Sequence, residues 1–209
     1  MYPFILSIFT HAMLFMLPVE NANPLEDFDA SWKDAQYTST NTAARVKYMK
    51  PIEKEIIQIL NLIRQNPQHF NNTVVAKWPE YMDRPDLKQN RYYSSLVKTL
   101  ADMKPVGLLA PDSISWVSAK CHAISSGKQG YTGHKRITKE CEQKEKFYGE
   151  CCQYGYEDAL EIIMSLLIDE DVPSLGHRII CLKSNFTGIG VSFQPHKEYG
   201  SNTVLDFTY

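Results

Sequence analysis

Helical hydrophobic patterns dominate the first two thirds of the chain. Apolar residues at spacings of three and four predict a helix over residues 51–65, which Asn66-Pro67 ends. The same spacing predicts helices over about 92–103, 112–127 and 155–168. In the helix over 112–127 the apolar stripe, which we expect to face inward, consists of Ile114, Val117, Cys121 and Ile124.

Extended patterns gather near the C-terminus. Residues 147–154 predict one strand, and alternating residues over 188–193 and 203–207 predict two more. Because the strands come late and are interrupted by few helices, the order favours an α+β fold. We expect helices layered on both faces of a small, mainly antiparallel sheet, as in a three-layer α-β-α sandwich.

The N-terminal 48 residues divide into two segments of different character. Residues 1–22 contain the apolar run Phe4–Leu17, which is shorter than the roughly 18 residues of a membrane span. This run predicts a signal peptide with Ala22 at the cleavage edge, and a retained anchor or a buried helix are the alternatives. Residues 23–48 are polar without a period and predict a linker or a loosely packed arm. Residues 49–209 then form one domain.

Composition and charge exclude some functions. The 209 residues are 44% hydrophobic and 22% charged, with a net charge of −2, as in ordinary globular proteins. No basic stripe of the kind that binds nucleic acid is present. The lysine-rich stretch 128–146 is interrupted by Glu140, Glu142 and Glu145, so we interpret it as a solvated loop.

The cysteines indicate an oxidising compartment. The chain has five, none in a CxxC pair: Cys121, Cys141, Cys151, Cys152 and Cys181. We expect two disulfides and one remaining thiol, and buried free thiols are the alternative. On a strand, Cys151 and Cys152 point to opposite faces and therefore need different partners.

The candidate chemistry lies in four short segments that contain His122, Glu150, Glu170 and His177. Two imidazoles with two carboxylates can bind a divalent cation such as zinc, transfer a proton, or satisfy buried polar groups. Spacing alone does not choose among these roles. The sequence has neither HExxH nor GxSxG, so zincin proteases and α/β-hydrolases are not indicated. His134, in a glycine-rich turn, is interpreted as a loop hydrogen-bonding residue.

Taken in order, these segments resemble a known superfamily over residues 53–209. The matching stretches include Lys120-Cys121-His122-Ala123, Phe147-Tyr148-Gly149-Glu150 and Pro173-Ser174-Leu175-Gly176-His177-Arg178, followed by Gly188-Ile189-Gly190-Val191 and Val204-Leu205-Asp206-Phe207. They resemble the CAP superfamily of cysteine-rich secretory, antigen 5 and pathogenesis-related 1 proteins, also called the SCP domain. Residues 169–178 resemble its microbial branch more than its animal or plant branches.

The resemblance implies a three-layer α-β-α sandwich with a shared cleft. By position, the cleft tetrad is His122, Glu150, His177 and Glu170, with Asp169 the alternative second acid. The resemblance implies that His122 and His177 hold zinc or another divalent cation. It also implies a secreted binding or signalling module with a lipid, sterol or protein partner. A metal-dependent hydrolase and a purely structural extracellular domain are the alternatives.

Two cysteines depart from the superfamily pattern. Cys151 replaces the usual Asn after Glu150, and Cys181 replaces an apolar residue. A bond from Cys181 to Cys151 or Cys152 would tie the segment after His177 to the strand of Glu150.

Overall fold

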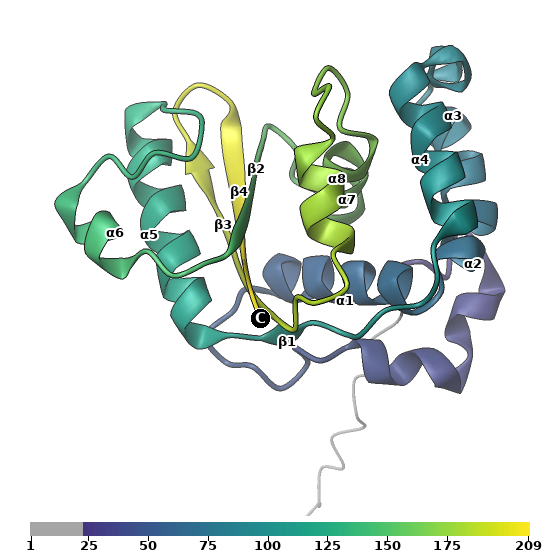
Figure 1. Ribbon diagram of the computed structural model, residues 1–209, viewed down its shortest axis with the longest axis horizontal. Coiled ribbons are helices and arrows are strands. Elements are labelled where there is room, and N and C mark those ends of the chain that lie inside the picture. The colour runs from purple at the N-terminus through teal and green to yellow at the C-terminus, as the bar shows by residue number, and fades with distance from the viewer. Residues whose placement is uncertain (1–22) are drawn as a thin grey trace, which may run out of the picture.

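A four-stranded sheet lies between helices in the computed structural model, which describes residues 23–209 (Figure 1). The strands are β1 (Ala110–Pro111), β2 (Gly149–Tyr154), β3 (Gly188–His196) and β4 (Gly200–Thr208), in the order β1-β3-β4-β2. β1 is parallel to β3, and the other neighbours are antiparallel. The predicted α+β class with a small, mainly antiparallel sheet is confirmed, and β2 is an edge strand.

Helices cover both faces of this sheet. One face carries α5 (Ser113–Gln129), with α6 (Lys139–Lys144) packed beside it. The opposite face carries α1 (Pro51–Gln65), α7 (Ala159–Ile168) and α8 (Gly176–Leu182). Beyond α1 and α7 lie α2 (Pro67–Thr73), α3 (Trp78–Tyr81) and α4 (Arg91–Asp102). The layers therefore follow the order helix, sheet, helix that the sequence predicted.

The apolar stripe of helix α5 faces outward, whereas the sequence predicted that it would face inward. Ile114 is 61% exposed and Val117 39% exposed. The buried face consists of small or polar residues: Ser115, Ser118, Ala119, His122, Ala123, Ser126 and Gly127. The reason is close packing, because a Cβ atom on Gly190 of β3 would lie 2.0 Å from the backbone nitrogen of Trp116. Only a face of small side chains allows the helix to approach the strand so closely.

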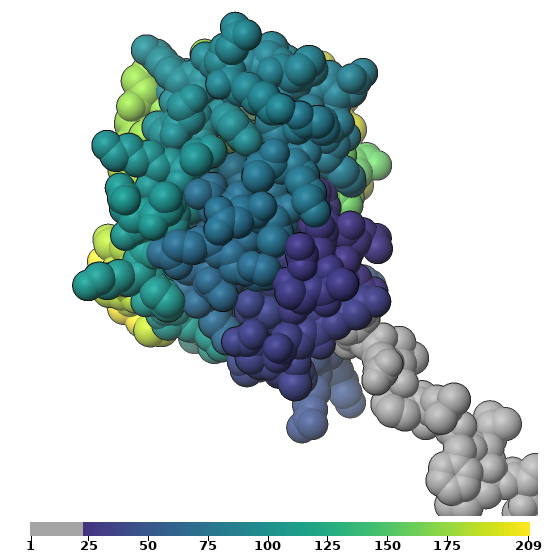
Figure 2. Space-filling model, turned by 90° about the vertical axis from the view of Figure 1, so that its right-hand side faces the viewer, coloured from purple at the N-terminus to yellow at the C-terminus, as the bar shows by residue number. Residues whose placement is uncertain are grey.

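Residues 23–48, for which the sequence predicted a linker or a loosely packed arm, pack against the domain (Figure 2). The segment contains two short 3-10 helices, Ala30–Lys33 and Ala35–Thr40. Leu25 and Trp32 are fully buried, and the indole nitrogen of Trp32 donates to Thr73 Oγ1 at 3.0 Å. The sequence did not predict this packing, because the few buried residues of the segment are separated by polar residues and their spacing matches neither a helix nor a strand.

The predicted signal peptide, residues 1–22, lies outside the described residues. Among residues 23–209, none of the helices has the length and apolar character that crossing a membrane requires.

Candidate functional site

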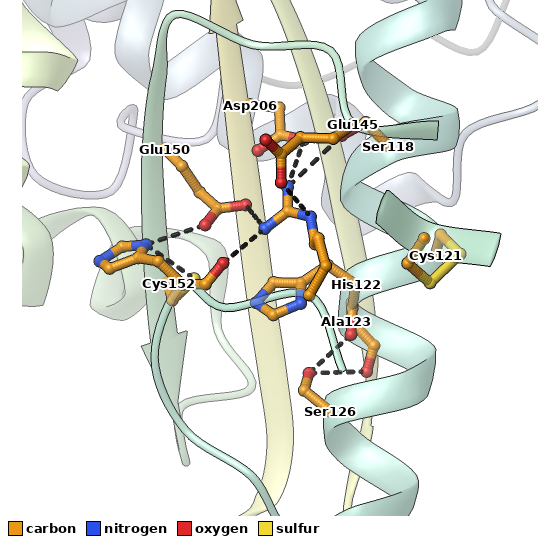
Figure 3. A network of polar contacts seen from close by, with 12 residues as sticks. Ser118, Cys121, His122, Ala123, Ser126, Glu145, Glu150, Cys152 and Asp206 are labelled. Atoms are coloured by element: carbon orange, nitrogen blue, oxygen red, sulfur yellow. Dashed lines mark hydrogen bonds and ion pairs between the residues drawn. A yellow bond between two sulfur atoms is a disulfide. The ribbon is translucent and has the colours of Figure 1, made fainter. Parts of the chain in front are cut away.

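A buried ion cluster between α5 and the sheet forms the base of the site (Figure 3). Glu150 and Asp206 are cross-strand neighbours on β2 and β4. The Arg136 guanidinium lies against both, with Nη1 2.6 Å from Glu150 Oε2 and Nη2 3.4 Å from Asp206 Oδ2. All three side chains are at most 2% exposed. An uncompensated charge at this depth is costly, so the cluster must be nearly neutral.

The pKa values of the two carboxyl groups are shifted in opposite directions. Burial, reinforced by the charge of Glu150, raises the pKa of Asp206 well above its usual value. Burial alone would also raise the pKa of Glu150, but hydrogen bonds from His134 and Arg136 lower it to about 2. Burial therefore favours the protonated form of Asp206, whereas the donors around Glu150 favour its charged form.

Glu150 also orients His134, which lies in the loop after α5. His134 Nδ1 is 2.8 Å from Glu150 Oε1, and the side chain of His134 is 58% exposed. This hydrogen bond to Glu150 raises the pKa of the imidazole. Because a charged carboxylate only accepts hydrogen bonds, Nδ1 carries the hydrogen. In the neutral ring the lone pair is then on Nε2, for which the structure gives no protein partner among the described residues.

Asp169 orients His177 in a similar way on the other side of β2. Asp169 follows α7 in the left-handed conformation, with φ 56°. Its Oδ1 lies 2.7 Å from His177 Nδ1, and its Oδ2 accepts the backbone N–H of His177 at 3.0 Å. The carboxylate thereby binds the first turn of α8 and sets the direction of the ring. The imidazole rings of His177 and His134 have centroids 6.4 Å apart.

The edge position of β2 explains how these two histidines meet. His134 arrives from the α5 side of the sheet and His177 from the α8 side. In the sheet's interior, neighbouring strands would separate the two sides. At the edge strand the two loops come near each other beside Glu150 and Cys151, and we use the name histidine cleft for the pair of rings His134 and His177.

Glu170 lies apart from the other members of the predicted tetrad, and His122 lies beside Glu150 rather than beside His177. Glu170 Oε1 accepts a hydrogen bond from Asn90 Nδ2 at 2.6 Å and lies 3.7 Å from Arg84 Nη2. Asp169, the alternative acid, is the one that contacts His177. His122 is fully buried, and its Nε2 donates to the Gly133 carbonyl at 2.8 Å. The structure therefore brings His134, rather than His122, opposite His177.

His122 belongs to a second group with metal-ligand chemistry. His122, Glu150 and Cys152 each offer one atom within 4.8 Å of the others, so this group could hold a metal ion. Two features of its surroundings are unfavourable for a bound cation. Glu150 already forms an ion pair with the Arg136 guanidinium, and burial raises the pKa of the Cys152 thiol well above its usual value. A metal would have to displace a proton from this thiol and share its carboxylate with a buried positive charge.

Sequence reasoning did not place Arg136 or Asp206 in the site, and it interpreted His134 as a loop hydrogen-bonding residue, which its contact with Glu150 confirms. One signal was available for Asp206, because it is a charged residue within an otherwise apolar strand segment. The cross-strand register that pairs it with Glu150 is a property of the fold. His134 and Arg136 lie in an irregular loop, where no period connects them to other residues.

The cysteines differ from the expectation of two disulfides. Among the described residues one disulfide is present, Cys121–Cys141, and it joins α5 to α6. The other three cysteines are buried thiols. Cys151 Sγ lies 4.0 Å from Cys181 Sγ, whereas Cys152 faces the α5 side near His134. The prediction that Cys151 and Cys152 point to opposite faces is confirmed.

Comparisons with known proteins add no further constraint. No protein-family model, curated protein or solved structure matches this chain.

Proposed function

We propose that this chain is a secreted, CAP-like binding module whose histidine cleft holds a divalent metal ion such as zinc. One observation carries the proposal. The rings of His134 and His177 have centroids 6.4 Å apart, and each has its Nδ1 held by a buried carboxylate. This is the usual support of metal-binding histidines, because the carboxylate fixes the tautomer and makes the other ring nitrogen a better ligand.

The number of ligands favours binding over a structural role for the metal. A structural zinc site generally has four protein ligands, and the cleft offers two imidazoles. Water or a donor atom of a bound partner would complete the coordination. The partner classes implied by the CAP resemblance, a lipid, a sterol or a protein, remain part of this proposal.

The carboxylates argue against the alternative of a metal-dependent hydrolase. A general base must accept a proton near neutral pH. Glu150, with its pKa lowered to about 2 and its oxygens engaged by His134 and Arg136, is a poor base. Asp169 is occupied by the ring and the backbone of His177. Both acids support imidazoles, which suits a binding site.

Secretion is supported by two features. The Cys121–Cys141 disulfide is the kind of bond that persists outside the reducing cytosol. The apolar segment 4–17 has the length of a signal-peptide core.

The test is zinc binding by isothermal titration calorimetry on metal-free purified protein. We expect His134→Ala and His177→Ala each to weaken zinc binding at least tenfold, and Asp169→Asn to weaken it about 10- to 100-fold through loss of ring orientation. His69→Ala is the matched control, because the His69 side chain contacts Ser31 and Trp32 of the N-terminal segment. It should bind zinc as the unchanged protein does.

His122→Ala distinguishes the two candidate metal groups. If folded His122→Ala loses zinc while His134→Ala retains it, the metal lies in the buried group and the proposal is wrong. Zinc affinity that is equal in all variants would also contradict it.

A further inference from the structure

The chain contains two sequences of the Asn-x-Thr type, which can accept an N-linked glycan, and the fold buries one and exposes the other. They are Asn71-Asn72-Thr73 in α2 and Asn185-Phe186-Thr187 between α8 and β3. Neither has proline at the middle position, which would prevent the reaction. A modified asparagine usually lies in a surface loop of a secreted protein, so burial and hydrogen bonds distinguish the two.

Asn185 lies in an exposed turn after α8, beside the C-terminus of the chain (Figure 1). Asn185 and Thr187 are both exposed, whereas Phe186 between them is 1% exposed. The Phe186 carbonyl accepts a hydrogen bond from Arg64 Nη2 at 2.9 Å, and the Thr187 N–H donates to the Thr208 carbonyl at 2.9 Å. The backbone of the turn is therefore fixed to the domain, and its two polar side chains are open to solvent.

The sequence in α2 is enclosed by the fold. Asn71 and Thr73 are each 8% exposed. Asn71 Nδ2, the nitrogen that would carry the sugar, donates to the Val97 carbonyl of α4 at 3.0 Å. Thr73 Oγ1 donates to the His69 carbonyl at 2.7 Å and accepts a hydrogen bond from the Trp32 indole. A glycan on Asn71 would have to enter the contact between α2 and α4, which the folded protein opposes.

Exposed aromatic rings beside Asn185 are a second observation. Tyr148 is 67% exposed and Tyr209 57% exposed, and their ring centroids are 4.6 Å apart. Residues on both sides of Asn185 contact Tyr209: the Phe186 ring at 5.3 Å and Lys183 Nζ at 5.7 Å from the ring centre. An exposed aromatic patch favours a covering group. A glycan on Asn185 would supply one, because the apolar faces of sugar rings pack against aromatic rings.

We propose that Asn185 carries an N-linked glycan and that Asn71 does not. Asn185 Nδ2 forms a bond to the anomeric carbon of an oligosaccharide carried on a lipid diphosphate. The bond from that carbon to the diphosphate oxygen breaks, the lipid diphosphate leaves with the electron pair, and Nδ2 loses one proton. Nothing is oxidised or reduced. The proposal rests on the secretion stated in the proposed function, because the chain meets this donor in the secretory pathway.

The glycan would leave the histidine cleft open. His177 is in the first turn of α8, and Asn185 follows the opposite end of this seven-residue helix. Such a helix is about 10 Å long. Asn185→Gln should therefore bind zinc as the unchanged protein does, which separates this proposal from the metal site.

The experiment expresses the full-length chain in cultured mammalian cells and treats the secreted protein with peptide N-glycosidase F. This enzyme converts a glycosylated asparagine to aspartate, so tandem mass spectrometry locates the glycan. We expect residue 185 to be recovered as aspartate and residue 71 as asparagine. Asn185→Gln and Thr187→Ala should each abolish the glycan, whereas Thr187→Ser should keep it because the hydroxyl group remains. Asn72→Gln, which changes an exposed asparagine outside the acceptor position, is the matched control and should keep the glycan.

Secreted protein that lacks a glycan on Asn185, or that carries one on Asn71, would overturn the proposal and leave secretion intact. A chain retained inside the cells would instead contradict the secretion part of the proposed function. The full-length chain preceded by a cleavable secretory signal then decides the matter. Modification of Asn185 in that protein would support the proposal, and unmodified Asn185 would overturn it.

Discussion

At the scale of single residues, the site depends on what each side chain is paired with. Glu150 and His177 were both predicted as site residues. The residues that they contact could not be predicted from the sequence. Asp169 contacts His177 through a left-handed residue at the end of α7, whereas Glu170, one position later, points to Asn90. A shift of one residue in such a turn changes which carboxylate reaches the ring, and sequence spacing does not determine the turn.

Glu150 should make the protein sensitive to acid. Its pKa is about 2 in the folded protein, below its ordinary value of 4.5. A depressed pKa contributes stability that is fully present above the unfolded value and is lost as the pH falls through the folded one. We therefore expect the free energy of unfolding to decrease between about pH 4.5 and pH 2. Urea denaturation across this range measures the effect.

Glu150→Gln should flatten this decrease and destabilise the protein at pH 7. Removing one partner of a buried ion pair typically costs about 3–5 kcal/mol. Asp206 can lose its proton to offset part of this cost, so we expect the lower end of that range. The control is Glu142→Gln, an exposed carboxylate of α6, which should leave the pH profile unchanged. The interpretation would be wrong if Glu150→Gln and the unchanged protein lost the same stability between pH 4.5 and pH 2.

At the scale of elements, hydrophobic periodicity predicted positions well and orientation less well. The helix predicted over 51–65 is α1 with the same bounds, and both C-terminal strands are present. The apolar stripe of α5, however, faces outward. Periodicity identifies an apolar face, but the sheet beneath α5 selects the face of small residues because Gly190 allows the backbones to approach. The short helices α6 and α8 lack enough residues to show a period.

Gly190→Ala tests this close approach of α5 and β3. The new methyl group would lie 2.0–2.5 Å from backbone atoms of Ser115 and Trp116, which cannot rotate away. We expect a loss of about 3 kcal/mol or more in the free energy of unfolding, at or beyond the usual cost of overpacking. Gly107→Ala is the matched control, because its Cβ would meet nothing within 4 Å. Equal urea midpoints for the two variants would contradict this account of α5.

At the scale of the whole molecule, the edge strand β2 connects the two helical layers. Its alternating residues supply Glu150 to the α5 side and Cys151 to the α8 side. The layered class could be predicted from the order of helices and strands. The proximity of His134 and His177 could not be predicted, because it depends on β2 being the edge of the sheet. That position follows from the strand order and not from a local sequence pattern.

Cys151 and Cys181 should link these layers covalently in an oxidising compartment. Their Sγ atoms are 4.0 Å apart, and both side chains are fully buried. The two thiols would lose two protons and two electrons to a small disulfide such as oxidised glutathione, which is reduced to two thiols. Burial raises the pKa of the Cys151 thiol, so exchange is slow in the folded protein and we expect the bond to form during folding.

Oxidative refolding in a glutathione buffer, followed by peptide mapping without reduction, tests this link. We expect a peptide pair joined through Cys151 and Cys181, with Cys152 recovered as an alkylated thiol. The link should add about 2–4 kcal/mol to the free energy of unfolding, which Cys181→Ser should remove and Cys152→Ser should leave in place. Recovery of Cys151 and Cys181 as free thiols, or a link from Cys181 to Cys152, would show that β2 and α8 are not joined in this way. A confirmed link would fix His177 of α8 to the strand of Glu150, so reduction should also weaken zinc binding if the cleft holds the metal.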